Sequence, residues 1–482
     1  MSFDLIFEKS KQGRRGYLLP AIDVPEMPLD SMISQNLLRA ELLPIPEIPE
    51  VEVVRHYVGL SHRNYSVDTG FYPLGSCTMK YNPKINEEVA KLSGFLKLHP
   101  FQSEQTAQGI LKLMYELTWC LSEITGMAWG SLQPYAGAHG EFTGMKMFRG
   151  YFKKKNEMKR DVIIVPDSAH GTNPASAHIA GFRVVEISSD RRGMIAADAL
   201  RPHLGETLAG IMLTNPNTLG LFEEDIKSVA NLIHRAGGLL YYDGANLNPI
   251  LGKCRPGDMG FDVVHLNLHK TFSTPHGGGG PGAGPVFVTK QMVPFLPEPV
   301  VNQTGDGYSL VSGSPDSIGS VSSFYGNIGV LIRAYAYLLS MGGDGLEGVA
   351  NYAVLNANYL RARLKGVFDI PYGNICKHEF VMSARKLKEQ FGVSAMDVAK
   401  RLLDHGIHPP TVYFPLIVAE ALMVEPTETE TKETLDDFVE VLMRIRRTAE
   451  ENPRLVQEAP HATPVRRLDE VRAARHPVLR WR

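Results

Sequence analysis

One lysine, Lys270, stands where a strand-like apolar run meets a glycine-rich turn. The run reads DVVHLNLHK, and the turn that follows it reads TFSTPHGGGGPGAGP. Lysine can form a Schiff base with a carbonyl compound, and the carboxyl edge of an open α/β sheet is where ligands bind. A surface lysine at a strand end is nevertheless the ordinary interpretation, since lysine side chains are mostly exposed. Lys270 therefore indicates a site only if its surroundings support one.

A second candidate, Asp243, ends another apolar run in GGLLYYDGAN. A carboxylate there could pair with a protonated pyridine nitrogen and keep a cofactor ring cationic, so that the ring accepts electron density from a carbanion. Ala245 is small and would leave room for a flat ring. An Asp-Gly pair is also a common turn signal, so Asp243 gains its meaning only beside Lys270.

A phosphate could be held upstream, in QPYAGAHGEFTGM, where Gly137 and Ala138 come just before a helix-like segment. Free backbone N–H groups and the helix dipole favour an anion at such a turn. The run Gly277 to Gly280 lacks the ending of a P-loop and the spacing of a Rossmann fingerprint. We interpret that run as a flexible or closely approached active-site loop.

Two more polar residues follow apolar runs. His170, in DSAHGTNPASA, could stack on a ring or relay a proton, and Asn215, in LTNPNTLG, could hydrogen-bond a phenolic oxygen. A lone histidine is often structural, and Asn-Pro is an ordinary turn signal. The chain order is phosphate turn, ring-stacking histidine, phenolic-oxygen partner, aspartate and lysine, which resembles the order in fold-type I pyridoxal-phosphate enzymes.

The elements that must position these residues alternate along the chain. Short apolar runs lie between helix-like stretches from 161 to 270, which predicts a mostly parallel sheet. Helical spacing predicts an amphipathic helix over 104–124 with Gly126 as its C-cap. Further helices are predicted over 328–341 and 345–366, and a small α+β domain from EFVMSA, SAMDVAKRLLDHG, TVYFPLI and DDFVEVLMRIRRTAE. Thr residues in the acidic stretch 425–437 are expected to lead into the last of these helices.

We predict three regions: an N-terminal arm or extension over 1–100, a large α/β domain over 101–345, and a small α+β C-terminal domain with a tail over 346–482. Prolines crowd the first 60 residues, which favours extended backbone. This segment is expected to wrap a partner chain.

Composition narrows the classes of function. The chain has 482 residues, 44% hydrophobic and 21% charged, with a net charge of -2, so nucleic acid is not an expected partner. Four widely spaced cysteines predict neither a disulfide framework nor a zinc ribbon, and we predict no metal site. Without a long apolar run or a signal-type start, we expect a cytoplasmic protein with no membrane partner. The basic clusters near Lys153 and after Arg466 are interpreted as solvated surface, although they could guide an acidic carrier protein.

Four longer motifs carry a resemblance to a known family. They are PLGSCTMKYNP (73–83), PYAGAHGE (134–141), DSAHGTNPASA (167–177) and NLHKTFSTPHGGGGPG (267–282), and they resemble glycine decarboxylase, the P-protein of the glycine cleavage system. The sequence is similar to the second half of the fused form of that family. The resemblance implies a fold-type I (aspartate aminotransferase-like) large domain with a smaller α+β domain, and a separate first subunit.

The resemblance also implies roles for single residues. Lys270 matches the lysine that forms a Schiff base with pyridoxal 5'-phosphate, Asp243 the partner of the pyridine nitrogen, and His170 the ring-stacking histidine. Gly137 and Ala138 match part of the phosphate turn. Catalytic roles are expected for Lys270 and His170 as proton carriers, without a division between them. The complete predicted cofactor-binding set is Lys270, Asp243, Ala245, His170, Gly137, Ala138, Asn215, Asn267, His269 and Ser320.

Some of these assignments concern the surroundings of the cofactor. Asn267 and His269 are expected to reach the phosphate or the ring's edge, and Ser320 to lie near the phosphate, across a subunit boundary. The stretch from Gly75 to Lys80 is expected to reach the active site.

The reaction implied by the resemblance is that of a glycine dehydrogenase (aminomethyl-transferring). Glycine loses carbon dioxide, and the aminomethyl group passes to the lipoyl arm of the H-protein. The implied assembly is an α2β2 heterotetramer with the first P-protein subunit. Two alternatives remain: another fold-type I enzyme, such as an aminotransferase or amino-acid decarboxylase, and a non-catalytic scaffold subunit. The presence of both Lys270 and Asp243 argues against a scaffold.

Overall fold

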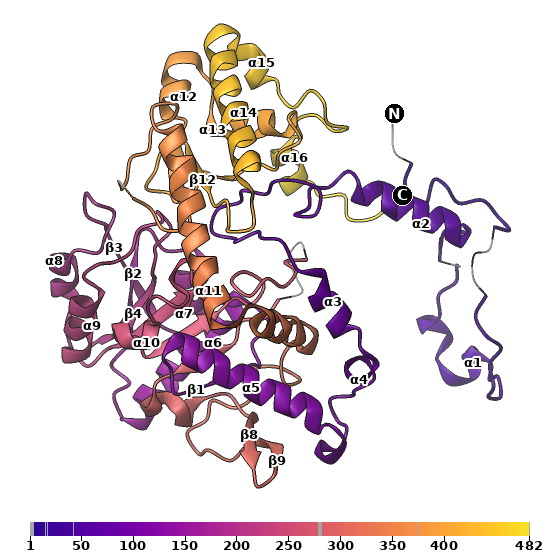
Figure 1. Ribbon diagram of the computed structural model, residues 1–482. Coiled ribbons are helices and arrows are strands. Elements are labelled where there is room, and N and C mark those ends of the chain that lie inside the picture. Colours follow the sequence, from indigo (N-terminus) through magenta and orange to yellow (C-terminus); the bar gives the residue numbers. More distant parts are fainter. Residues whose placement is uncertain are drawn as a thin grey trace. The chain divides into compact units, whose positions relative to one another are not determined.

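The computed structural model in Figure 1 describes residues 4–14, 16, 18–41, 43–277, 282–373 and 375–481. The chain divides into two compact units. One unit comprises Met1–Ser66 with Ala462–Arg482, and the other comprises Val67–His461. Within the described residues, no helix combines the length and the apolar character needed to cross a membrane. The boundaries predicted at 100 and 345 stay a prediction.

A seven-stranded sheet forms the centre of the larger unit, in the order β1-β7-β6-β5-β4-β2-β3. Among its described strands, β7 alone runs antiparallel to its neighbours. The inner strands are buried along their whole length, as expected for a parallel sheet that is covered on both faces. The strands are β1 Trp129–Ser131, β2 Val162–Pro166, β3 Arg183–Ile187, β4 Leu208–Thr214, β5 Leu239–Gly244, β6 Val263–Leu266 and β7 Val286–Val288.

The prediction of a mostly parallel sheet is confirmed, because each of the five apolar runs contains one parallel strand. The sequence did not predict β1 and β7. Both strands have only three residues, which is too short for a periodic signal.

Helices cover both faces of this sheet (Figure 1). Neighbouring residues of a strand point to opposite faces, and accordingly Tyr242 belongs to the apolar cluster that includes α5 (Gln108–Thr125) and α9 (Ile226–Arg235). Tyr241 belongs instead to the cluster that includes α6 (Gly137–Lys154). The predicted helix over 104–124 is α5, and Gly126 caps it with a φ of 70°.

The long helix α11 (Ile328–Leu364) contains one non-helical residue, Gly342, with a φ of 62°. It combines the two helices predicted over 328–341 and 345–366. Shorter elements complete this part of the unit: α3 Lys84–Ala90, α4 Ser93–Leu96, η2 Glu104–Thr106, α7 Thr172–Ile179, α8 Ala197–Leu200, η3 Arg201–His203, η4 Asn248–Ile250, α10 Pro256–Met259, η5 Lys290–Phe295, and the hairpin of β8 Val300–Thr304 and β9 Gly307–Val311.

A second, three-stranded sheet has the order β10-β12-β11. Its strands are β10 Phe380–Ser383, β11 Thr411–Val412 and β12 Ala421–Val424, and its helices are α12 Arg385–Phe391, α13 Ala395–Leu403, α14 Lys432–Glu451 and α15 Pro453–Gln457. The expected strand in TVYFPLI is confirmed for two residues only. Tyr413 has a positive φ of 58° and Pro415 cannot donate to a ladder, so the strand ends there. The expected lead-in to α14 is confirmed, with Thr431 as its N-cap.

The smaller unit contains α1 Leu29–Met32, η1 Gln35–Leu37, α2 Glu50–Ser61 and α16 Glu470–Arg475. Neither α1 nor η1 buries a single residue. These two elements therefore contribute no buried side chains to a hydrophobic core.

Glycines allow α6 to approach the sheet closely. A substitution at Gly144 tests this packing. A Cβ atom at Gly144 would lie 2.2 Å from Cε2 of Tyr241. We expect Gly144→Ala to lower the free energy of unfolding by about 1–3 kcal/mol, as overpacked cores do. Gly348→Ala is the matched control, because nothing lies within 4 Å of a Cβ there and alanine favours a helix. Thermal unfolding of both variants checks the prediction, and equal midpoints would contradict it.

Candidate active site

Lys270 lies just beyond β6, at the carboxyl edge of the large sheet. Its Nζ donates a hydrogen bond of 2.7 Å to the carbonyl oxygen of Ser76. Ser76 and Thr78 both have positive φ angles, of 62° and 45°, so this stretch has an unusual backbone for residues that carry a Cβ. The segment from Gly75 to Lys80, expected to reach the site, thus places Ser76 against the amine.

Asp243 lies at the end of β5, the strand beside β6, and is 3% exposed. Its Oδ2 accepts a hydrogen bond of 2.9 Å from the Asn173 side chain, and its Oδ1 accepts one of 3.0 Å from the backbone of Ala245. Nε2 of His265 lies 3.4 Å from Oδ1. Burial by itself would raise the pKa of Asp243, but His265, Asn173, the Ala245 backbone and Lys270 outweigh it and hold the pKa below its usual value. Asp243 is therefore a carboxylate at neutral pH.

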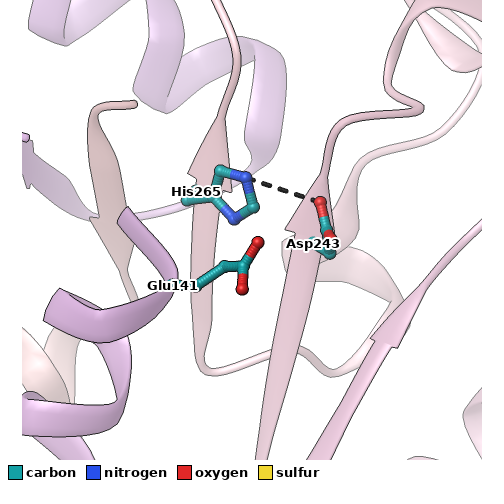
Figure 2. A group of neighbouring side chains, drawn as sticks. All are labelled: Glu141, Asp243 and His265. Carbon is teal, nitrogen blue, oxygen red and sulfur yellow. Dashed lines mark ion pairs between the residues drawn. The ribbon is translucent and has the colours of Figure 1, made fainter. Parts of the chain in front are cut away.

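Figure 2 shows the group that Asp243 forms with Glu141 from α6 and His265 from β6. Burial is the main cause that lowers the pKa of His265, so its imidazole is neutral at neutral pH. Nδ1 of His265 lies 2.7 Å from the hydroxyl of Tyr241. A neutral ring with its hydrogen on Nε2 accepts the hydrogen of the Tyr241 hydroxyl at Nδ1, whereas Nε2 faces Asp243 at 3.4 Å without forming a hydrogen bond among the described residues.

His170 lies two residues before α7, at an exposed position of the loop that follows β2. The ring lies edge-on to Phe414, with 5.7 Å between ring centroids. Partial burial lowers the pKa of His170, as does the Lys270 cation, whereas Asp243 acts in the opposite direction. Lys270, Asp243 and His170 are thus close enough to influence one another electrostatically, and the structure brings these three predicted residues together.

The predicted phosphate turn forms the start of α6. Gly137 is the first residue of this helix, and no side chain in the described part of the chain caps its N-terminus, so backbone N–H groups remain for an anion. A Cβ atom at Gly137 would lie 2.6 Å from Oδ1 of Asn267, so a side chain there would force the Asn267 amide to move. That buried oxygen has no hydrogen-bond partner among the described residues. Both features fit a bound polar group at this turn.

His269 lies edge-on to His276, with 5.0 Å between ring centroids. Burial is the main cause that lowers the pKa of His269 to about 3 and that of His276 to about 4. Both imidazoles are therefore neutral near pH 7. Residues 278–280 of the predicted glycine-rich loop lie outside the described residues.

Two predicted residues turn to other partners. The side-chain oxygen of Asn215 accepts a 2.9 Å hydrogen bond from the backbone of Glu223, and its carbonyl accepts one from Tyr242. Ser320 is exposed, and its hydroxyl donates to the carbonyl of Ser322. The roles expected for Asn215 and Ser320 stay predictions.

The sequence missed two buried carboxyl groups beside the lysine. Glu379 accepts a 2.6 Å hydrogen bond from the backbone of Ser76, and Glu425 accepts bonds from the backbone and hydroxyl of Thr78. Burial and their mutual repulsion raise the pKa of Glu379 well above its usual value, and burial raises that of Glu425 to about 7. The available signal was their position, since Glu379 directly precedes β10 and Glu425 directly follows β12.

Comparison with solved structures places this fold in a class. The chain is similar to a glycine decarboxylase (P-protein) crystal structure (TM-score 0.73, 22% identity, covering 86% of this chain and 94% of that one). It is also similar to a sphingosine-1-phosphate lyase of Burkholderia pseudomallei (TM-score 0.62, 13% identity, 91% and 94%) and a cysteine desulfurase of Thermococcus onnurineus (TM-score 0.62, 14% identity, 79% and 95%). The fold is that of the fold-type I pyridoxal-phosphate enzymes, as predicted.

Sequence comparison gives the family. The model for the glycine cleavage system P-protein matches residues 26–309, and the model for the glycine dehydrogenase C-terminal domain matches residues 349–462. A probable glycine dehydrogenase (decarboxylating) subunit 2 of Caldanaerobacter subterraneus is 61% identical over 99% of this chain and 98% of its own length. The relative of the same name from Lysinibacillus sphaericus is 59% identical over the same shares. The chain belongs to the P-protein family, which confirms the resemblance.

Glu425 gives the site a testable pH dependence. The folded protein keeps a proton on Glu425 up to about pH 7, whereas an unfolded chain releases it near the ordinary value of 4.5. The folded state therefore binds more protons in this interval, and stability falls as the pH rises through it. We expect Glu425→Gln, which cannot titrate, to show a smaller fall in thermal midpoint between about pH 4.5 and about pH 7.

The matched control is Glu440→Gln, on an exposed position of α14. Its midpoint should follow the wild-type curve. If the Glu425→Gln curve also runs parallel to the wild type, then Glu425 does not hold a proton in the folded protein.

Proposed function

We infer that this chain is the second subunit of a glycine decarboxylase, with pyridoxal phosphate bound at Lys270. The observation that carries this proposal is the placement of an amine and a buried carboxylate at neighbouring strand ends, in a chain whose relatives with near-complete coverage are named for this activity. When bound, pyridoxal phosphate supplies an aldehyde for a Schiff base and a ring that accepts the electron pair left by decarboxylation.

The residues of this chain fit that cofactor. Lys270 supplies the amine for the Schiff base, and its hydrogen bond to Ser76 already orients it. Asp243 is ionised and buried, so it would hold a proton on the pyridine nitrogen. The support behind Asp243 matters as much as the carboxylate itself, because His265 and Asn173 hold its position and its charge.

Other residues would bind the remaining parts of the cofactor. The exposed ring of His170 is available for stacking. Gly137 and Ala138 would hold the phosphate at the N-terminus of α6, with Asn267 and His269 at its edge. Ala245 leaves space beside Asp243, while Asn215 and Ser320 are proposed to reach the cofactor only after a change of hydrogen-bond partner.

In the proposed reaction, glycine loses carbon dioxide and its aminomethyl group passes to the lipoyl arm of the H-protein. The residues around glycine would select decarboxylation over proton loss by orienting the substrate. Lys270 and His170 would carry protons beside the substrate. A general amino-acid decarboxylase or aminotransferase remains the alternative, and it would act on other amino acids without a lipoyl protein.

The proposed assembly is an α2β2 heterotetramer with the first P-protein subunit. Apolar side chains of the smaller unit support a protein partner, because exposed apolar patches mark interaction surfaces. The segment 18–45, which we name the apolar arm, exposes Leu18, Leu19, Ile22, Val24, Met27, Leu29, Met32, Ile33, Leu37, Leu43 and Ile45. We propose that the first subunit covers the apolar arm, and that the complex acts in the cytoplasm.

The cofactor assignment is tested by reduction with borohydride, which fixes a Schiff base to its lysine. We expect the peptide that contains Lys270 to carry the cofactor, and Lys270→Arg to lose the label, because a guanidinium does not form this bond. The same variant should lose more than about 100-fold of the carbon exchange between glycine and bicarbonate, measured with the first subunit and lipoylated H-protein. Lys112→Arg, at an exposed lysine of α5, is the control.

Two results would contradict the proposal. A label that persists in Lys270→Arg would place the cofactor elsewhere. Exchange that is unchanged when the lipoylated carrier and the first subunit are left out would favour the alternative enzymes.

If the first subunit covers the apolar arm, charged substitutions in the arm should weaken assembly. Each large apolar side chain contributes about 1.5–3 kcal/mol when buried. Replacement of Leu18, Leu19 and Ile22 by Asp should therefore weaken binding of the first subunit by more than about 100-fold. Asp23→Lys combined with Glu26→Lys is the control, because it changes charge in the same segment and keeps its apolar area. Sedimentation of the mixed subunits checks this, and equal binding of both variants would rule the arm out as the interface.

A further inference from the structure

A continuous chain of hydrogen bonds links the buried Glu141 to the exposed ring of His170. Oε1 of Glu141 lies 2.8 Å from Oγ1 of Thr172, and the same Oγ1 lies 2.8 Å from Nδ1 of His170. Glu141 is 3% exposed, and its second oxygen accepts a 2.9 Å hydrogen bond from Ser176. One carboxyl oxygen of Glu141 therefore contacts Thr172, and the other contacts Ser176.

The Thr172 hydroxyl has a single hydrogen, and both of its neighbours can use it. When Glu141 is ionised, this hydrogen points at the carboxylate. Oγ1 of Thr172 and Nδ1 of His170 would then be two acceptors 2.8 Å apart, unless Nδ1 carries the imidazole hydrogen and gives up the longer, 3.3 Å hydrogen bond from the backbone N–H of Thr172. When Glu141 is protonated, it donates to Oγ1, and the hydroxyl donates to Nδ1. The imidazole hydrogen then sits on Nε2.

We propose that Glu141 is a proton store for His170, connected through Thr172, and that the protonation of Glu141 sets which nitrogen of His170 carries hydrogen. When Glu141 loses its proton, its O–H bond breaks and a new O–H bond forms at Thr172. Thr172 passes its original hydrogen to Nδ1 of His170, and the N–H bond at Nε2 breaks. One proton leaves from Nε2 to a base in the site. No oxidant or further reactant takes part.

Burial and a charged neighbour bring the pKa of Glu141 close to neutral pH. Asp243 on β5 faces Glu141, and burial together with that carboxylate raises the pKa of Glu141 to about 7. His265 on β6 and Tyr241 on β5 lie against the same group and are uncharged near pH 7. Asp243 and Lys270 face His170, whose pKa is lowered. Glu141 therefore titrates at a higher pH than the imidazole of His170.

Glu141 and Thr172 act through His170 and are positioning residues. The proton store is a property of this chain alone, but its use in catalysis rests on the proposed function. In that setting, Nε2 of His170 is a donor while Glu141 is protonated and an acceptor once Glu141 is ionised. His170 would exchange a proton with the substrate without becoming an imidazolium cation beside Lys270.

The test is nitrogen NMR of the full chain with 15N-labelled histidine. His170→Gln identifies the resonances of His170 among the 16 histidines. Between about pH 6 and about pH 8, on either side of the Glu141 pKa, we expect the hydrogen to move from Nε2 to Nδ1 in the wild type. Thr172→Val should abolish this change and keep the hydrogen on Nε2, because the backbone N–H of Thr172 still donates to Nδ1.

Two more variants distinguish loss of the proton relay from a general disturbance of the structure. Thr172→Ser keeps a hydroxyl and should restore the change of tautomer, and Glu141→Gln should remove it because an amide does not titrate. A wild-type ring whose tautomer is constant over this range would overturn the proposal, as would a change that persists in Thr172→Val or Glu141→Gln. The measurement needs neither glycine nor cofactor, so loss of the exchange activity and loss of the relay are separate outcomes.

Discussion

The carboxylate of Asp243 is buried at the carboxyl edge of an otherwise apolar sheet, and this is the constraint around which the site is arranged. An isolated carboxylate in such surroundings is expensive and takes up a proton instead. Here the charge persists because hydrogen bonds from Asn173 and Ala245 and the nearby His265 offset the loss of water. His265 in turn contacts the hydroxyl of Tyr241, so the polar region extends from Asp243 through His265 to Tyr241.

The parallel sheet explains why these groups meet. Neighbouring strands β5 and β6 run in the same direction, so residues at their carboxyl ends share one edge. Close packing of α6 brings Glu141 down onto that edge, and the packing depends on glycines such as Gly140, where a Cβ would lie 2.6 Å from a backbone oxygen. The close packing of α6 against the sheet therefore also determines which charged groups meet in the site.

Much of this arrangement could be predicted from the sequence. Parallel strands are continuous apolar runs, so they are visible without an alignment, and a polar residue at the end of such a run is placed at the ligand edge. Lys270 and Asp243 were found in this way, and the family resemblance then supplied their roles.

What could not be predicted depends on residues far apart in the chain. Glu141 lies in a helix and looks like an ordinary surface glutamate, since only the folded protein buries it against Asp243. Glu379 and Glu425 border strands of the second sheet, and their partners Ser76 and Thr78 precede them by hundreds of positions. Composition and periodicity report local structure, and they contain no information on such distant pairs.

The contacts of the segment from Gly75 to Lys80 also set an order on how the site is made during synthesis. Ser76 meets Lys270 and Glu379, and Thr78 meets Glu425. A growing chain therefore carries the lysine long before the carboxyl groups that hold Ser76 and Thr78 exist. Contacts of such long range form late, after loop-closure entropy has been overcome. Nascent chains that stop before residue 425 would carry the Lys270 amine without these surroundings, so the site becomes organised only after residue 425 has been synthesised.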